Sequence, residues 1–270
     1  MTRMTLTDEL QADYRQLFST CVPRDDRSEE IETLISAMVA DRDRYQAVAK
    51  ELGMPWFVVA ALHAVERQRD FSCHLHNGDP LTERTRHMPD GRPKDGDPPF
   101  TWEESACDAL RLRFLDQWHD WSIPGTLFKL EEYGTWGYRQ HHPEVLSPYL
   151  WSGSTHYEKG KYITNDTWSD TAVYGHCGAA VLLRRLAEQG HIDFPDANRE
   201  TIPTLRYTEE GSPDPWVTEL QRSLNRVPGI FIKVDGLAGP RTSEALHRLI
   251  GHYLPEDPRA TEEVFTPSAN

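Results

Sequence analysis

The chain has 270 residues, enough for one large or two ordinary domains that each bury a core. Its formal net charge of −14 argues against nucleic acid and anionic lipid as partners, because both reward a basic surface. Hydrophobic residues make up 38%, and no apolar run approaches the roughly 20 residues that cross a bilayer, so we expect a soluble protein without membrane insertion.

The N-terminal segment does not have the pattern of a signal peptide. Arg3, Asp8 and Glu9 interrupt its first ten residues, which contain no apolar stretch. We therefore expect synthesis in the cytoplasm and, for a target outside it, release or injection by another route. The four cysteines lie far apart without the spacing of a metal knuckle, and we expect free, mostly buried thiols. They are Cys21, Cys73, Cys107 and Cys177.

Apolar residues at helical spacing dominate the chain as far as Leu52 and predict two or three amphipathic helices. Gly53 ends this run. Pro55 then suits the first turn of an apolar helix over 56–62 that carries Glu66 at its C-terminal end.

The helical period disappears over 70–97, where Asn77-Gly78 predicts a turn between two short strands, 72–75 and 81–85. Helices resume with a capping box formed by Thr101 and Glu104. Ser169 is expected to cap a helix that runs through 179–183 to Gly190. The segment 133–168 between these helices is predicted to be loop-like.

Four prolines among the polar residues of 191–215 predict a linker, which we place over 196–215. This places a domain over 1–195 and a second one over 216–254, with two amphipathic helices in the latter. The tail 255–270 is expected to be disordered.

Glu66 is the first candidate for acid catalysis. A carboxylic acid protonates a glycosidic oxygen at neutral pH only if its pKa is raised, usually by apolar surroundings at the edge of a cleft. Glu66 follows eleven residues of which only His63 is polar, so its backbone is expected in the core. The alternative, and the commoner case for an arbitrary glutamate, is a helix-end carboxylate in solvent.

Several segments together resemble a family of bacterial and phage lysozyme-like proteins. The resemblance covers most of 45–190 and is carried by 63–66, 70–71, 74–81, 138–139, 147–153 and 160–162. It implies a mainly α fold of the α+β lysozyme-like type with a small β-hairpin, and a general-acid role for Glu66. In the family a small residue such as serine commonly follows the glutamate. Here Arg67 follows, and it would lower the acid's pKa if the two side chains met.

A second carboxylate would stabilise an oxocarbenium-like transition state or activate water. Asp79, in the predicted turn, is the first candidate and Asp70 the second. Turn aspartates commonly bond nearby backbone amides instead, and both roles of Asp79 stay open. If Glu66 acts alone, a lytic transglycosylase becomes more plausible than a hydrolase.

Aromatic residues of the loop-like segment are candidates for stacking on sugar rings. We expect Tyr133, Tyr149 and Trp151 in a substrate cleft, with Asn77 as a polar contact. The alternative for such residues is the core.

Other chemistries are less well supported. His74 and His76 alternate along a predicted strand and could share a zinc ion, but no third ligand is nearby, so we expect neither metal nor cofactor. The sequence favours no cysteine nucleophile, because Cys73 lies in a predicted strand and Cys177 in an apolar helix. A Gly-x-Ser-x-Gly elbow is absent.

The C-terminal segment 216–252 resembles the three-helix peptidoglycan-binding domain of wall hydrolases. The similarity is carried by Val217, Leu220, Gln221, Leu224, 234–236, Gly239, Thr242, Ala245 and Leu246. It implies peptidoglycan as the partner, and such tethering would raise the local substrate concentration. The module could equally be a stabilising lid.

We thus expect a muramidase that cleaves the β-1,4 bond between N-acetylmuramic acid and N-acetylglucosamine in the periplasm or cell wall. It would be a phage endolysin or a secreted antibacterial effector, the latter with a possible immunity protein as partner. The rivals are a lytic transglycosylase, a chitinase or chitosanase, and a non-catalytic wall-binding protein.

Overall fold

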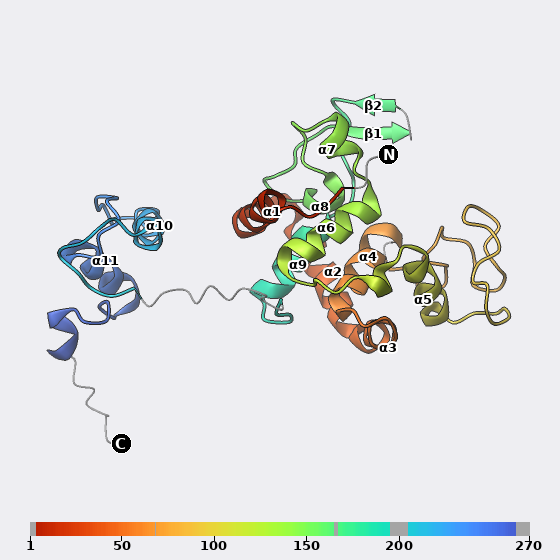
Figure 1. Cartoon of the computed structure of the whole chain (residues 1–270), viewed down its shortest axis with the longest axis horizontal. Coiled ribbons are helices and arrows are strands. Elements are labelled where there is room, and N and C mark those ends of the chain that lie inside the picture. The colour runs from red at the N-terminus through yellow and green to blue at the C-terminus, as the bar shows by residue number, and fades with distance from the viewer. Residues whose placement is uncertain (1–3, 68, 165–166, 195–204, 263–270) are drawn as a thin grey trace, which may run out of the picture. The chain divides into compact units, whose positions relative to one another are not determined.

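The computed structural model describes residues 4–67, 69–164, 167–194 and 205–262 and is mainly helical (Figure 1). The chain divides into two compact units, 1–197 and 198–270. The expectation of a mainly α protein is confirmed, and the structure also has a small two-stranded antiparallel sheet.

The first unit contains nine of the described α-helices, two short 3-10 helices and one two-stranded sheet. The helices are α1 (Asp8–Thr20), α2 (Ser28–Ala40), α3 (Arg42–Leu52), α4 (Trp56–Arg67), α5 (Trp102–Leu112), α6 (Ile123–Gly134), α7 (Gly137–His141), α8 (Pro148–Trp151) and α9 (Ala179–Glu188), with η1 (Asp25–Arg27) and η2 (Leu115–Gln117). Strands β1 (Lys161–Thr164) and β2 (Thr167–Ser169) pair antiparallel, with Tyr162 opposite Trp168.

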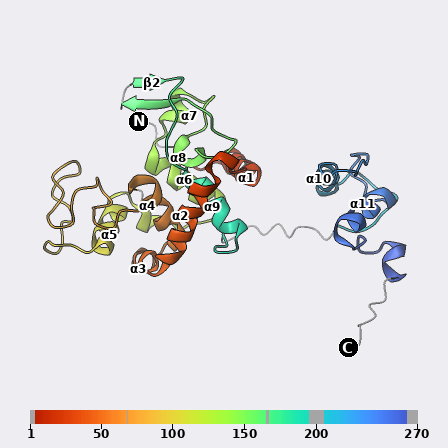
Figure 2. The same ribbon diagram turned by 180° about the vertical axis from the view of Figure 1, so that it is seen from behind.

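Helix α4 is the centre of this unit. Its residues from Val58 to Leu62 are fully buried, and it packs against α2, α3 and α9 (Figures 1 and 2). Gly53, with φ 66°, lets the chain leave α3 in the left-handed conformation that favours glycine. Burial on all sides fixes the course of α4 and hence the position of Glu66 in its last turn.

No single described helix is both long and apolar enough to span a membrane. A bent pair, Arg42–Leu52 with Trp56–Glu66, meets the length and composition criteria only when its two parts, 114° apart, are taken together.

A buried charged network holds α6 against α1. Glu131 is 1% exposed and accepts hydrogen bonds from Tyr14 Oη at 2.5 Å and Arg139 Nε at 2.8 Å. Arg139 also donates to Asp13 at 3.0 Å. Burial raises the pKa of Glu131 against the opposing effect of Arg139. Removing one partner would leave a buried charge uncompensated, so the network keeps α6 in one position.

The sheet lies where the sequence predicts loop, and the predicted hairpin is wrong. Between 72 and 85 the structure forms a single antiparallel bridge, Cys73 to Pro80, and no continuous strands. The Asp79 N–H donates to Asn77 Oδ1 and the Thr85 N–H to the Arg92 carbonyl, so these groups do not extend the bridge into a ladder. The segment 133–168, predicted as loop, contains the end of α6, α7, α8, β1 and most of β2.

Two capping predictions have opposite outcomes. The capping box of Thr101 and Glu104 is present at the start of α5. Ser169 lies in β2 instead, and α9 begins after Gly178. A Cβ at Gly178 would lie 2.3 Å from the carbonyl oxygen of Leu150, so close packing against α8 requires glycine there.

Three of the four cysteines are buried thiols, as expected. Burial raises the pKa of Cys21 to about 11 and the pKa of Cys107 and Cys177 to about 12. These side chains therefore stay protonated at neutral pH and act as small apolar groups.

The second unit contains α10 (Pro215–Leu224), α11 (Pro240–Ile250) and the 3-10 helix η3 (Pro258–Glu262). Gln221, 1% exposed, links them: its amide donates to Thr242 Oγ1 at 3.0 Å and accepts from the backbone of Asp235 and Gly236 at 2.9 Å. One buried amide thus fixes the turn that joins the two helices.

The boundaries of this unit are wider than predicted. Within the predicted linker, residues 196–204 lie outside the described residues, but Leu205 and Tyr207 pack on the apolar core of the unit. In the predicted disordered tail, Asp257 is 1% exposed and bonds Ser243. The described parts of both segments, 205–215 and 255–262, therefore belong to the folded unit; residues 263–270 lie outside the described residues.

His63, one turn before Glu66 on α4, makes folding sensitive to pH. It is fully buried against Tyr45, Phe71 and Trp102, and its Nδ1 is 3.2 Å from Tyr45 Oη. Burial lowers the pKa of His63 to about 4. Between pH 6.5 and 4, His63 therefore binds a proton in the unfolded chain but stays neutral in the folded chain.

We predict that this side chain makes the free energy of unfolding fall by about 3 kcal/mol as pH decreases from 6.5 to 4. Urea unfolding of His63→Gln across this range should show a correspondingly smaller pH dependence than the native chain, with His119→Gln, at an exposed histidine, as control. Parallel curves for native chain and His63→Gln would contradict the assignment.

Candidate functional site

Glu66 is partly buried in the last turn of α4, and its carboxylate is oriented by a buried phenol. Tyr149 Oη donates to Glu66 Oε1 at 2.9 Å. Tyr149, on α8, is 8% exposed, and burial followed by the charge of Glu66 raises its pKa well above the ordinary value. Tyr149 therefore remains a hydrogen-bond donor at any physiological pH. The Arg67 side chain, which would lower the pKa of Glu66 if the two side chains met, lies outside the described residues.

Gly134, the last residue of α6, explains how Tyr149 reaches Glu66. A Cβ at Gly134 would lie 2.6 Å from the Tyr149 ring, so the ring packs directly on the α6 backbone. Any larger residue at 134 would displace the ring. The position of Tyr149 thus depends on α6, which is itself fixed by Glu131.

A second phenol, Tyr174, belongs to the surroundings of Glu66. Burial and then the charge of Glu66 raise the pKa of Tyr174 to about 12. Its backbone N–H donates to Tyr157 Oη at 3.1 Å, and its carbonyl accepts from Ser152 Oγ at 3.2 Å. Tyr174 lies in the loop between β2 and α9, and the sequence reasoning did not single it out.

Two cavities of the first unit border residues next to this site. The α2 cavity, about 640 Å³, has an acidic lining that reaches Ala64, two residues before Glu66. The α6 cavity, about 590 Å³, lies between 112–118 and α6 and reaches Tyr133, which precedes Gly134. The α2 cavity includes Asp26, Glu29, Glu30, Ala64, Arg69 and His176, and the α6 cavity Arg113, Phe114, Trp118, Lys129, Glu132 and Tyr133.

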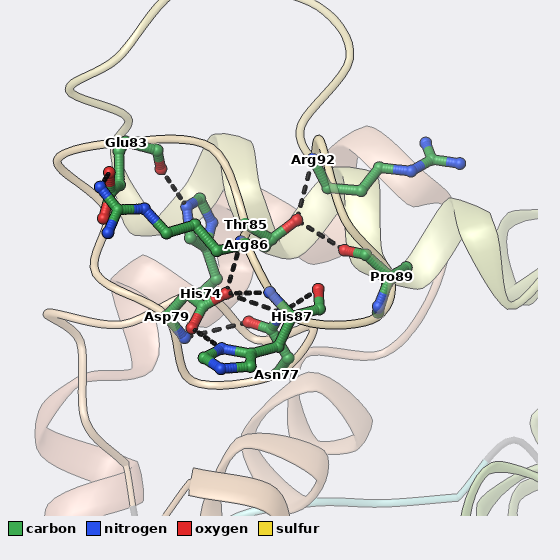
Figure 3. A network of polar contacts seen from close by, with 9 residues as sticks. All are labelled: His74, Asn77, Asp79, Glu83, Thr85, Arg86, His87, Pro89 and Arg92. Atoms are coloured by element: carbon green, nitrogen blue, oxygen red, sulfur yellow. Dashed lines mark hydrogen bonds and ion pairs between the residues drawn. The ribbon is translucent and has the colours of Figure 1, made fainter.

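Asp79 is the centre of a hydrogen-bond network in the loop that follows α4 (Figure 3). Its Oδ2 accepts from the backbone of Arg86 at 2.7 Å and of His87 at 2.9 Å, and from Asn77 Nδ2 at 3.0 Å. Its Oδ1 pairs with His87 Nδ1 at 2.7 Å. The His87 contacts lower the pKa of Asp79. Both oxygens are thus engaged, which favours the turn role; the catalytic role stays a prediction and would require this network to open.

Asn77 and Asp70 also have local partners. Asn77 donates to the carbonyl of His87 at 2.8 Å and accepts from the Asp79 backbone at 3.0 Å. Asp70 Oδ1 accepts from the backbone and hydroxyl of Ser72, at 2.8 and 2.6 Å. These contacts stabilise the loop conformation around both side chains. The substrate contact expected for Asn77 stays a prediction.

The two histidines of the predicted strand fasten the loop to α5. His74 lies 2.7 Å from Ser105 Oγ, and His76 lies 2.8 Å from Asp108 Oδ2. The other oxygen of Asp108, Oδ1, accepts from Arg92 at 3.2 Å. Within the described ranges, no group of three or more His, Cys, Asp or Glu side chains is placed to hold a metal ion.

The three predicted aromatic residues have different environments. Tyr149 contacts Glu66, and Tyr133 lines the α6 cavity with Arg113 5.1 Å above its ring. Trp151 is fully buried in the core, so its assignment to a substrate cleft is wrong: no face of its ring is open for stacking. Trp118 and Phe114, which line the α6 cavity, were not predicted as site residues; the available signal was two arginines and two aromatic residues within 111–118.

Comparison of the chain with protein-family models, curated proteins and solved structures finds no match.

We predict that Asp79→Asn loosens the loop, because an amide places donors against the His87 contacts. Hydrogen exchange at the backbone amides of Arg86 and His87 should speed up by at least an order of magnitude, whereas Asp90→Asn, on the exposed surface of the same loop, should leave it unchanged. Unchanged exchange in Asp79→Asn would show that the network does not hold the loop.

Proposed function

We propose that the chain cleaves the β-1,4 bond between N-acetylmuramic acid and N-acetylglucosamine of peptidoglycan, with Glu66 as general acid. The observation that supports this most is the placement of Glu66: it ends a fully buried apolar helix, and buried Tyr149 holds one of its oxygens. A carboxyl group so fixed, at the margin of an apolar core, has the orientation and surroundings that proton donation to a leaving oxygen requires.

The proposed step uses the side chain of Glu66 directly. Its proton passes to the glycosidic oxygen as the bond from this oxygen to the anomeric carbon breaks, and positive charge develops on the sugar ring. Tyr149 keeps the carboxyl group in one rotamer through the step and stabilises the carboxylate that forms.

A lytic transglycosylase is the second candidate, on the same bond. The engagement of both Asp79 oxygens by its own loop favours a mechanism in which Glu66 is the only catalytic carboxylate. The anomeric carbon of N-acetylmuramic acid would then be captured by a hydroxyl group of the same sugar, whose proton returns to Glu66, and the product would carry an anhydro-muramic end. Hydrolysis would leave a reducing end.

The second unit is proposed to bind the cell wall. It contains a cavity of about 350 Å³ at α11, with Arg241 and Arg248 two turns apart on that helix and Phe231, 87% exposed, beside them. Exposed aromatic surface next to two cations suits a polymer that combines sugar rings with carboxylates.

We predict that Glu66→Gln digests purified peptidoglycan about 10²–10⁴-fold more slowly than the native chain. The amide keeps an oxygen for Tyr149, so thermal stability should change little. Glu51→Gln, at an exposed carboxylate, is the matched control and should digest normally.

The outcome separates the rivals. Equal digestion by native chain and Glu66→Gln would refute the acid role. Digestion of chitin but not peptidoglycan would indicate a chitinase, and binding without digestion a wall-binding protein.

We predict that replacing both Arg241 and Arg248 by glutamine weakens retention of the Glu66→Gln chain on isolated cell walls by about tenfold. Co-sedimentation measures it, and Arg222→Gln, on the exposed face of α10, should sediment as before. Unaltered retention of the double variant would place wall binding elsewhere.

A further inference from the structure

The α6 cavity has properties that the acid role of Glu66 does not explain. Its lining combines a rigid aromatic wall, an ion pair and an exposed cation. Its volume of about 590 Å³ falls within the range typical of small-ligand sites.

The aromatic wall of the cavity includes the Trp118 ring, which neighbouring residues hold in one orientation. The Trp118 ring stacks on Phe128, with centroids 5.7 Å apart and planes at 20°, and its indole N–H donates to the carbonyl of Asp120. Lys129 Nζ lies 4.9 Å from the Trp118 centroid. A ring fixed in this way offers a surface to a ligand without losing rotational freedom on binding.

The lining of the α6 cavity contains two cations and one carboxylate, so it has a net positive charge. Lys129, 7% exposed, is neutralised by Glu132. Arg113 takes part in no ion pair of the described residues, whereas Arg111, two residues earlier, pairs with Glu51. In a chain with a formal net charge of −14, a site with a net positive lining is selective for anions.

The rim of the cavity carries a strained and exposed aromatic residue. Phe114 has φ 58°, a conformation that is uncommon outside glycine, and is 63% exposed. Its backbone is locked by hydrogen bonds to Arg111 and from Gln117. Strain at an exposed phenylalanine beside a cavity points to a binding function.

We propose that the α6 cavity binds the acidic peptide branch carried by N-acetylmuramic acid, with Arg113 as the partner of a peptide carboxylate. This inference rests on the proposed function and adds a preference for peptide-bearing glycan. The branch has the required chemistry, since it joins aliphatic side chains to free carboxylates. Its attachment to the sugar beside the cleaved bond agrees with the contacts that link the cavity to Glu66: Tyr133 lines the cavity, and its neighbour Gly134 packs on Tyr149, which bonds Glu66.

The first test is binding by the full chain, independent of activity. The probe is the tripeptide L-Ala-D-Glu-L-Lys, titrated while the indole N–H signals are followed by NMR. We expect the Trp118 signal to shift, the affinity of Arg113→Gln to fall about tenfold, and Arg113→Lys to retain most of it. Arg111→Gln, outside the cavity lining, is the control. No shift of Trp118, or equal affinity of Arg113→Gln and native chain, overturns the proposal.

The second test compares glycan strands with and without their peptides. We expect Arg113→Gln to lower kcat/KM about tenfold, through KM, on peptide-bearing strands and to leave it unchanged on stripped ones. An equal decrease on both would contradict peptide recognition. If the native chain cleaves neither substrate, the proposed function fails, and the tripeptide titration still decides whether the cavity binds the acidic peptide.

Discussion

Complete burial of helix α4 is the constraint on which the rest of the first unit depends. Five consecutive residues, Val58 to Leu62, have no exposed surface, so the helix has no freedom to rotate or slide without exposing apolar area. Glu66 follows one turn later and takes its place from that packing. The buried His63 between them is kept neutral by the same surroundings. The backbone of Glu66 is therefore positioned more rigidly on this helix than it would be on a loop.

The orientation of Glu66 comes from a second chain of contacts. On α1, Tyr14 donates to Glu131 and Asp13 accepts from Arg139. Arg139 also donates to Glu131, and these bonds fix the position of α6. The Tyr149 ring packs on Gly134, the last residue of α6, and the Tyr149 hydroxyl donates to Glu66. The same end of α6 carries Tyr133 and forms one wall of the α6 cavity. The proposed acid and the proposed peptide site thus share one rigid support, which would couple recognition to cleavage geometry.

Sequence patterns predicted the local features of this fold better than its long-range ones. Helical spacing, the capping box of Thr101 and the apolar run before Glu66 were all visible, because each depends on neighbours in the chain. The hairpin at 72–85 was wrong because backbone groups of this segment bond to other partners, as Asp79 does with Asn77 and Thr85 with Arg92. Trp151 was misassigned because a loop-like composition does not reveal core packing. Tyr174 and the α6 cavity were missed, since both depend on contacts between separate segments: Tyr174 with Glu66, and 112–118 with α6.

Mass spectrometry of the soluble fragments that the native chain releases from purified peptidoglycan tests the central claim most directly. The account predicts glycan fragments that end in N-acetylmuramic acid, either reducing or in the anhydro form, with their peptides intact. Fragments that end in reducing N-acetylglucosamine, or peptides cut free of the sugar, would contradict it.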